Sequence, residues 1–226
     1  MKVLFLILAS GGGFYDKFTE QWKRYMNSNP SCECYFYRYS SVEELSGNTL
    51  FLKGTENMHN LYQKTLDALK FFEHRLHEFD FICRPNLSSF FIFDRYLEYL
   101  EGLPKTMCME GAINNYGGMP YPSGCGFSFT PDIAKILLER QDKQIQIDDI
   151  TFGKVCKEIG VKIHTHPLRK YIEITDSNLE KTIERIHADQ TIFHMRLKQQ
   201  GRTASRWADV KNYTSLVNEF YKDLIV

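Results

Sequence analysis

The sequence predicts an α/β fold with a mixed, mostly parallel, Rossmann-like central sheet flanked by helices. Three observations support this. Residues 3–9 form a continuous apolar run, the pattern of a central strand covered on both faces. Strand-like and helix-like segments alternate over the first hundred residues, as in parallel sheets with crossover helices. The chain after residue 175 reads as polar helices with spaced apolar anchors.

Each expected element follows from a local pattern. Strands are predicted at 3–9, 34–39, 49–52, 79–84, 105–110 and 161–164. Helices are predicted at 14–26, 57–79, 88–102, 130–140 and 149–159. Thr130 followed by Pro131 is an N-cap with proline at the first helical position. Residues 111–126, rich in Gly, Pro and Asn, are expected to form one long irregular loop. We therefore expect one domain over 1–175 and a helical extension, packed on it, over 176–226.

Composition excludes several classes of protein. The 226 residues carry 28 basic and 28 acidic side chains, so no electrostatic footprint for nucleic acid exists. The first apolar run is about seven residues, against roughly 20 for a membrane-spanning helix. We expect no transmembrane segment, a cytoplasmic protein, and six reduced cysteines, since none forms a Cys-x-x-Cys pair.

The expected sheet also indicates where a ligand binds. In parallel sheets, ligands lie beyond the carboxyl ends of the strands. That rule selects residues 10–13, 39–41, 84–88 and 111–126. Neither G-x-G-x-x-G after the first strand nor G-x-x-x-x-G-K-[ST] occurs, which argues against a dinucleotide oxidoreductase and a P-loop enzyme.

Three ordered stretches carry a resemblance to a known family. They are 63–70 (QKTLDALK), 79–90 (FDFICRPNLSSF), and the pair 121–130 (YPSGCGFSFT) with 148–153 (DDITFG). Together they resemble the beta-1,3-galactosyltransferase and Fringe group of GT-A glycosyltransferases. The pair 121–130 and 148–153 is the most specific of the three. Its first part is similar to the group's small-residue strand, and its second part is similar to the acidic "EDVxxG" motif that follows.

The resemblance implies a GT-A fold and a hexosyltransferase activity. Its members transfer a sugar from a nucleotide-sugar donor, here a UDP-sugar, to a hydroxyl of a glycan acceptor with inversion. By resemblance, Asp149 or Asp148 is the base that takes the acceptor proton. The alternative reading of this pair is structural, since acidic residues at a helix start cap it and suit its dipole.

The sequence departs from the family at its metal motif. Where the family has Asp-x-Asp, this chain has Asn86, Leu87 and Ser88. Neutral oxygens are poor ligands for the divalent ion (Mn²⁺ or Mg²⁺) that the resemblance implies, so metal dependence is left open. Cationic side chains are candidates to take over its charge, and they are Lys64, Arg84, His194, Arg196 and Lys198. His194 and Lys198 are expected to share one face of a helix.

The remaining candidates follow from position and chemistry. The donor-binding set adds Ser10, Asn86, Ser88, Gly124 and Gly126. Tyr116 and Tyr121, in the expected loop, are candidate acceptor contacts because aromatic rings stack on sugars. His164 and His166 are the weak candidates for a metal.

A second function is compatible with the same residues. A GT-A protein that has lost its metal motif could bind a sugar nucleotide or a glycan without catalysis. The missing Asp-x-Asp favours that alternative, and the retained Asp148–Asp149 pair favours the enzyme. Eukaryotic members of the group usually carry a membrane anchor, and none is expected here. This favours a bacterial or viral setting, or a soluble enzyme that acts on cytosolic glycan precursors.

Overall fold

The computed structural model describes residues 1–165, 172–175, 178–198 and 206–224. The chain divides into two compact units. The first comprises Met1–Ser10, Glu33–Asn86 and Leu103–Thr165. The second comprises Gly11–Cys32, Leu87–Gly102 and His166–Val226. Residues 176–226 thus belong to a unit that also takes in two earlier segments, and the domain boundary expected at 175 stays a prediction.

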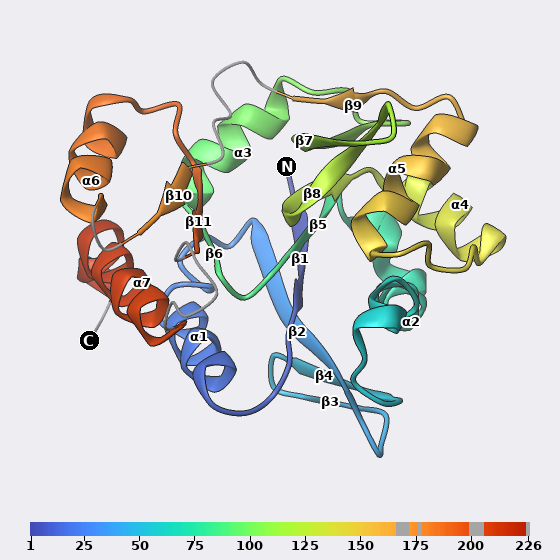
Figure 1. The fold of residues 1–226 in the computed structure, drawn as a ribbon, viewed down its shortest axis with the longest axis horizontal. Coiled ribbons are helices and arrows are strands. Elements are labelled where there is room, and N and C mark those ends of the chain that lie inside the picture. The colour runs from blue at the N-terminus through green and yellow to red at the C-terminus, as the bar shows by residue number, and fades with distance from the viewer. Residues whose placement is uncertain (166–171, 176–177, 199–205, 225–226) are drawn as a thin grey trace. The chain divides into compact units, whose positions relative to one another are not determined.

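The first unit is built on an eight-stranded sheet in the order β3-β4-β2-β1-β5-β8-β7-β9. Its strands are β1 (Val3–Leu8), β2 (Cys32–Ser40), β3 (Glu44–Ser46), β4 (Thr49–Lys53), β5 (Phe81–Pro85), β7 (Met109–Tyr116), β8 (Met119–Phe129) and β9 (Ile163–His164). Its helices are α2 (Leu61–Phe71), α4 (Pro131–Arg140) and α5 (Asp148–Glu158), with 3₁₀ turns η1 (Met58–Asn60) and η2 (Glu73–Glu78). Figure 1 shows the three α-helices of this unit on one side of the sheet.

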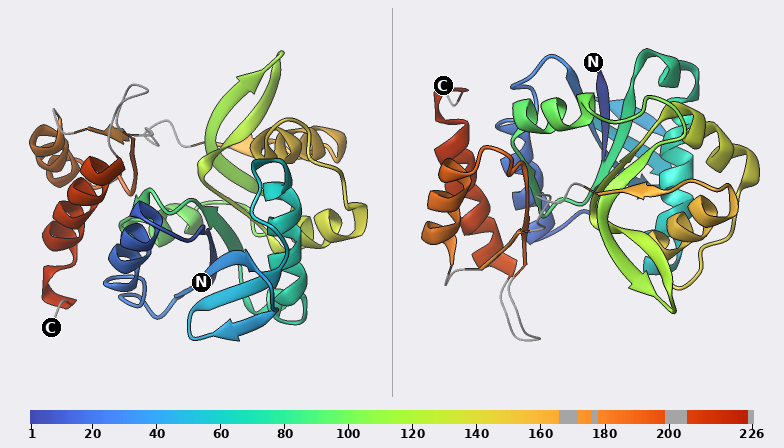
Figure 2. Two further views of the ribbon diagram at one scale, coloured as in Figure 1. Left: turned by 60° about the horizontal axis from the view of Figure 1, so that its bottom comes forward. Right: turned by 90° about the horizontal axis from the view of Figure 1, so that it is seen from above.

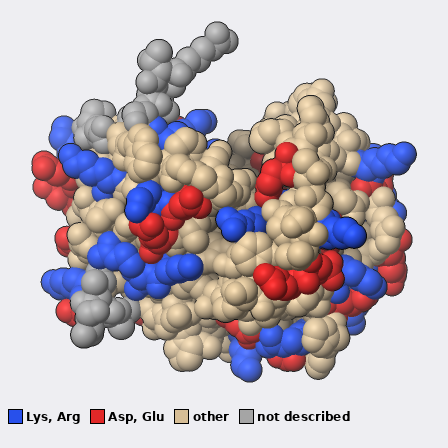
Figure 3. Space-filling view, turned by 90° about the horizontal axis from the view of Figure 1, so that it is seen from below, with Lys and Arg blue, Asp and Glu red and all other residues tan. Residues whose placement is uncertain are grey.

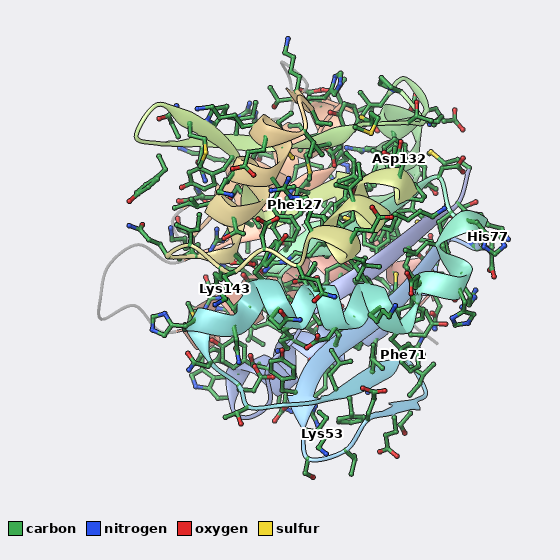
Figure 4. The ribbon with its side chains drawn as sticks, turned by 90° about the vertical axis from the view of Figure 1, so that its right-hand side faces the viewer. Lys53, Phe71, His77, Phe127, Asp132 and Lys143 are labelled. Atoms are coloured by element: carbon green, nitrogen blue, oxygen red, sulfur yellow. The ribbon has the colours of Figure 1, made fainter. Side chains whose placement is uncertain are left out.

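The apolar first strand lies at the centre of this sheet, as predicted. Val3 and Phe5 of β1 pair in parallel with Phe81 and Cys83 of β5. Five of the six residues of β1 are buried, which explains why its sequence has no polar alternation. The core beneath α2, α4 and α5 includes Phe127, which Figure 4 labels among those helices. The mixed α/β fold with a mostly parallel central sheet is therefore confirmed.

The second unit contains a smaller sheet in the order β10-β11-β6. Its strands are β6 (Ser89–Phe91), β10 (Ile172–Ile174) and β11 (His194–Leu197). Its helices are α1 (Phe14–Lys23), α3 (Phe93–Glu101), α6 (Leu179–Ala188) and α7 (Arg206–Phe220), followed by the 3₁₀ turn η3 (Lys222–Leu224). Buried aromatic rings form its core: Trp22 stacks on Tyr25 at 5.1 Å between centroids, and the Trp22 indole N–H donates to Leu87 O at 2.9 Å.

The irregular loop expected at 111–126 is wrong. These residues belong to a long antiparallel hairpin of β7 and β8, which projects beyond the rest of the sheet in both views of Figure 2. Gly117 and Gly118, with φ of 56° and 83°, form its turn. Pro120 and Pro122 are tolerated because β8 pairs with β5 only from Gly126 onward, so this stretch of β8 lacks that second neighbour.

Two helix predictions in the second unit are also wrong. Ser89–Phe91 pairs with β11 as strand β6, and the predicted helix at 88–102 begins only at Phe93. His194 and Lys198 share no helix face, because 194–197 is strand β11, paired with β6 and β10. Backbone pairing with neighbouring strands overrides local helical spacing in both segments. The first unit has a smaller departure, since the helix expected over 57–79 is α2 flanked by 3₁₀ turns.

The surface carries both signs of charge, as expected for a chain with equal numbers of basic and acidic residues. The face in Figure 3 shows Lys and Arg interspersed with Asp and Glu rather than a broad expanse of one sign. In the part of the chain that the structure describes, no helix has the length and apolar character needed to cross a membrane. All six cysteines are buried, and none of them forms a disulfide.

Candidate functional site

Two adjacent carboxylates begin helix α5. Ile147, in an extended conformation, is the N-cap residue, and no side chain makes a capping hydrogen bond there. Asp148 and Asp149 are therefore the first two helical residues, and neither is the cap that the structural reading of the sequence supposed. Asp148 is buried and Asp149 is half-buried. Their charges suit the helix dipole, but burial of both goes beyond what a dipole contact needs.

Gly124 of β8 holds the carboxylate of Asp149. Its backbone N–H donates to Asp149 Oδ2 at 2.6 Å. A Cβ atom at Gly124 would lie 2.3 Å from Oδ1 and 2.7 Å from Oδ2 of that carboxylate. No other residue fits here without displacing Asp149, so the glycine is needed for close approach rather than for a turn.

A second glycine completes the contact between α5 and β8. A Cβ at Gly153 would lie 2.4 Å from Tyr121 Cβ and 2.7 Å from Pro120 O. Asp149 and Gly153 are four residues apart, so they lie on one face of α5. The two sequence stretches 121–130 and 148–153, which carry the most specific part of the resemblance, thus pack directly against each other.

Replacing Gly153 by alanine tests this packing. We expect Gly153→Ala to lower the free energy of unfolding by about 1–3 kcal/mol, because the new methyl group overlaps Tyr121 and Pro120. Thermal and urea denaturation would measure it. Gly102→Ala is the control, since its Cβ meets only Tyr99 O at 3.6 Å. A Gly153→Ala protein more stable than wild type, as helix propensity alone would give, would contradict the packing.

A buried arginine joins the two aspartates to β8. Arg84 of β5 is 2% exposed. Its Nη2 donates to Asp148 Oδ2, and its Nη1 donates to Gly124 O at 3.0 Å. The guanidinium also lies 5.6 Å from the centroid of the Phe127 ring. The charge of Arg84 is therefore paired with that of Asp148 inside the protein.

These contacts set the ionisation of the site. Burial, followed by the neighbouring Asp148 charge, raises the pKa of Asp149 to about 6, against the opposing effects of Arg84 and the Gly124 N–H. Burial disfavours the charge of Arg84, but Asp148, Tyr37 and Asp149 together outweigh burial, and the pKa of Arg84 is raised. A carboxylate with a pKa near 6 is charged at neutral pH and still basic enough to accept a proton.

A second cation lies at the carboxyl end of β1. Lys64 of α2 is fully buried, and its Nζ donates to Ala9 O at 2.7 Å and to both carboxylate oxygens of Glu56 at 2.7 and 2.8 Å. Burial lowers the pKa of Lys64, and Glu56 opposes that shift. Ser10 follows Ala9 directly and is half-buried. The expected donor residues Ser10 and Lys64 are thus neighbours at this edge, with Lys64 paired internally.

Asn86 lies at the same edge of the sheet. It follows β5 and forms a parallel bridge with Leu8, the last residue of β1. Its side-chain Oδ1 is buried and has no hydrogen-bond partner among the described residues. A buried oxygen without a partner is costly, and a bound hydroxyl or N–H group would satisfy it.

The fold of this chain is similar to that of a known enzyme. No protein-family model and no curated protein matches the sequence. Among solved structures, a similar one is the "crystal structure of a glycosyltransferase involved in the glycosylation of the major capsid of PBCV-1". The TM-score is 0.57 at 10% sequence identity, over 95% of this chain and 100% of that one.

The fold is that of a glycosyltransferase. At this identity the likeness concerns the fold, and it agrees with the GT-A architecture expected from the sequence. Membership of the beta-1,3-galactosyltransferase and Fringe group stays a prediction.

The other residues expected at the site are spread over both units. Ser88 lies in the second unit, where its backbone O accepts from Leu197 N at 2.9 Å. His194 is buried in β11 and stacks on Phe91 at 4.2 Å between centroids. Arg196 lies opposite Ser89 in the same ladder, and Lys198 Nζ lies 3.7 Å from Glu173 Oε1.

The hairpin carries the remaining candidates. Gly126 is buried opposite Pro85 in the β5–β8 ladder. Tyr121 packs on Gly153, while Tyr116 is 43% exposed and its hydroxyl accepts from Gln146 Nε2. His164, in β9, lies beside Glu110 in the ladder with β7. His166 lies outside the described residues.

The residues at the expected metal motif do not fit a divalent ion. Asn86 offers one neutral oxygen, and hard divalent cations favour several carboxylate ligands. Over the described ranges, no three His, Cys, Asp or Glu side chains gather in a way that could hold a metal. We therefore derive the chemistry of the site from its side chains alone.

Sequence reasoning missed two residues of the site. Glu56 is the partner that neutralises Lys64. The one sequence signal for this pair is that Glu56 is an acidic residue eight positions before Lys64. Gln146, two residues before Asp148, has a left-handed φ of 51°, which is uncommon outside glycine. Such backbone strain clusters at functional sites, and no sequence signal predicted it here.

Proposed function

We propose that this protein is a glycosyltransferase that transfers a sugar from a nucleotide-sugar donor to a hydroxyl of a glycan acceptor. The observation that carries the proposal is the half-buried carboxylate of Asp149, fixed by the Gly124 N–H at 2.6 Å. The raised pKa of that carboxyl suits a general base. Likeness to a glycosyltransferase fold supports the same activity.

The reaction is an in-line displacement with inversion at the anomeric carbon. The acceptor hydroxyl oxygen forms the new bond to this carbon while its proton passes to Asp149. The bond from the anomeric carbon to the phosphate oxygen breaks, and its electron pair leaves with the nucleoside diphosphate. Asp149 rather than Asp148 is the base, because Asp148 is buried and engaged by Arg84.

The donor occupies the carboxyl edge of β1 and β5 in this proposal. Ser10 and the unsatisfied Asn86 Oδ1 offer hydrogen bonds to a ribose or sugar hydroxyl there. A UDP-sugar is the first donor to test, on the resemblance described above. Tyr116 and Tyr121 lie on the same hairpin as Gly124 and present rings to the acceptor glycan.

One observation favours a second function. Since the Asn86 position lacks the carboxylates of a metal site, the protein could bind a sugar nucleotide or a glycan without turning it over. Both functions require donor or glycan binding, and only the enzyme requires Asp149 to ionise.

Donor binding and turnover separate the two. UDP-, GDP- and CMP-sugars would be titrated calorimetrically with and without Mn²⁺, and nucleoside diphosphate release would be followed with glycan acceptors. The enzyme predicts binding of one sugar nucleotide and release that Asp149→Asn lowers roughly 10²–10⁴-fold and Asp142→Asn retains. Binding without release in every combination supports the non-catalytic function. No binding of any donor overturns the enzyme, and failure to bind both donors and glycans overturns both functions.

A further inference from the structure

Arg84 was expected to contact donor phosphate, but its geometry indicates another role. The side chain is 2% exposed, and its two terminal nitrogens are directed at Asp148 and at Gly124 O. In an ion pair so deeply buried, the charge of Arg84 is neutralised by Asp148 and is not offered to a ligand. Removing either partner would leave the other as an uncompensated buried charge.

The backbone of Gly124 connects this arginine to Asp149. Gly124 C=O accepts from Arg84 Nη1 at 3.0 Å, and Gly124 N–H, in the preceding peptide group, donates to Asp149 Oδ2 at 2.6 Å. Arg84 therefore holds Asp149 through the backbone of this β8 residue and holds its neighbour Asp148 directly. The planar guanidinium suits this task, because it can satisfy two acceptors in fixed directions at once.

We infer that Arg84 is a positioning residue, which fixes the Asp149 carboxylate through the backbone of Gly124 and through Asp148, and that it does not bind the donor. The inference rests on the proposed function for its catalytic consequence. Its structural part concerns only residues of the first unit and can be tested without any substrate.

Asp148 and Arg84 are the charged side chains that act most strongly on Asp149. Asp148 is its neighbour on α5, Arg84 faces it from β5, and β8 contributes the uncharged Gly124 N–H. The quantity to follow is therefore the pKa of Asp149. The charge of Arg84 lowers this pKa, so its removal should raise it.

The test compares Arg84→Met, Arg84→Lys and the control Arg140→Met in the full-length protein. Arg140 belongs to an ion-pair network with Asp142 and Glu158 in the same unit. Carbon-13 NMR of labelled aspartate carboxyls would follow the titration of Asp149, and calorimetry would give the Kd for UDP. For Arg84→Met we expect the pKa of Asp149 to rise by about one unit or more, with the Kd for UDP changed less than about twofold.

Arg84→Lys keeps the charge but lacks the planar group that directs two N–H donors at the two acceptors. We expect it to leave the titration close to that of wild type and to lower kcat about tenfold or more with an unchanged donor KM. Arg140→Met should change none of these. The inference is overturned if Arg84→Met leaves the titration unmoved, or if either Arg84 variant weakens UDP binding tenfold. Should Arg84→Met fail to fold, the split between kcat and KM in Arg84→Lys decides. If wild type transfers no sugar, the proposed function fails while the titration still tests the inference.

Discussion

Replacing Asp149 by asparagine is expected to lower sugar transfer by roughly 10²–10⁴-fold, the usual contribution of a general base. Asparagine keeps the shape of the side chain and an oxygen to accept the Gly124 N–H, so the fold and the donor site are retained. Turnover with the donor identified by titration measures the loss, and the donor Kd should stay within about twofold of wild type, because the base acts on the acceptor.

Asp148→Asn and Asp142→Asn are the matched comparisons. Asp148→Asn removes the counter-ion of Arg84 and should reduce both stability and turnover. Asp142 lies in the loop between α4 and α5, where it pairs with Arg140, and Asp142→Asn should retain turnover within a few-fold. An Asp149→Asn protein as active as Asp142→Asn would exclude Asp149 as the base.

Gly124→Ala is expected to reduce turnover by about 100-fold, because the new methyl group must displace the Asp149 carboxylate. A misplacement of about 1 Å at a reacting group can cost this much. The same overlap should destabilise the fold by about 1–3 kcal/mol. Steady-state turnover and urea denaturation would measure the two effects.

Gly102→Ala serves again as the control, since its Cβ has open space apart from one contact at 3.6 Å. The two effects of Gly124→Ala should appear together, because one clash causes both. A variant that is destabilised yet fully active would show that Asp149 can move without consequence and would count against its proposed role.

Much of the first unit could be predicted because its signals are local. The apolar run of β1 has one plausible place in a parallel sheet, and Thr130 with Pro131 marks the start of α4 unambiguously. In the sequence, residues 121–130 and 148–153 are linked by their resemblance to two ordered motifs of one family, and not by any predicted contact. The structure supplied the reason, which is close approach of α5 to β8 at Gly124 and Gly153.

Other features depend on partners distant in sequence and could not be predicted. Residues 194–197 have helical spacing, but β6 and β10 make them a strand. The prolines in β8 suggested a loop. Only the structure shows that β5 pairs with β8 from Gly126 onward, so the prolines lie in a part of β8 that β5 does not reach. Arg84 and Lys64 are candidates for donor binding because of their positive charge. The sequence does not indicate that Asp148 neutralises Arg84 or that Glu56 neutralises Lys64.

The pH dependence of turnover tests the central claim most directly. Because Asp149 accepts a proton, it must be ionised, so activity is lost as the pH falls below its raised pKa of about 6. We would measure kcat/KM for transfer between pH 4.5 and 8.5 on wild type and Asp149→Asn. A wild-type limb near pH 6, missing from the residual activity of the variant, is the predicted result. A limb near pH 6 that persists in Asp149→Asn, or a wild-type rate independent of pH over this range, would contradict it.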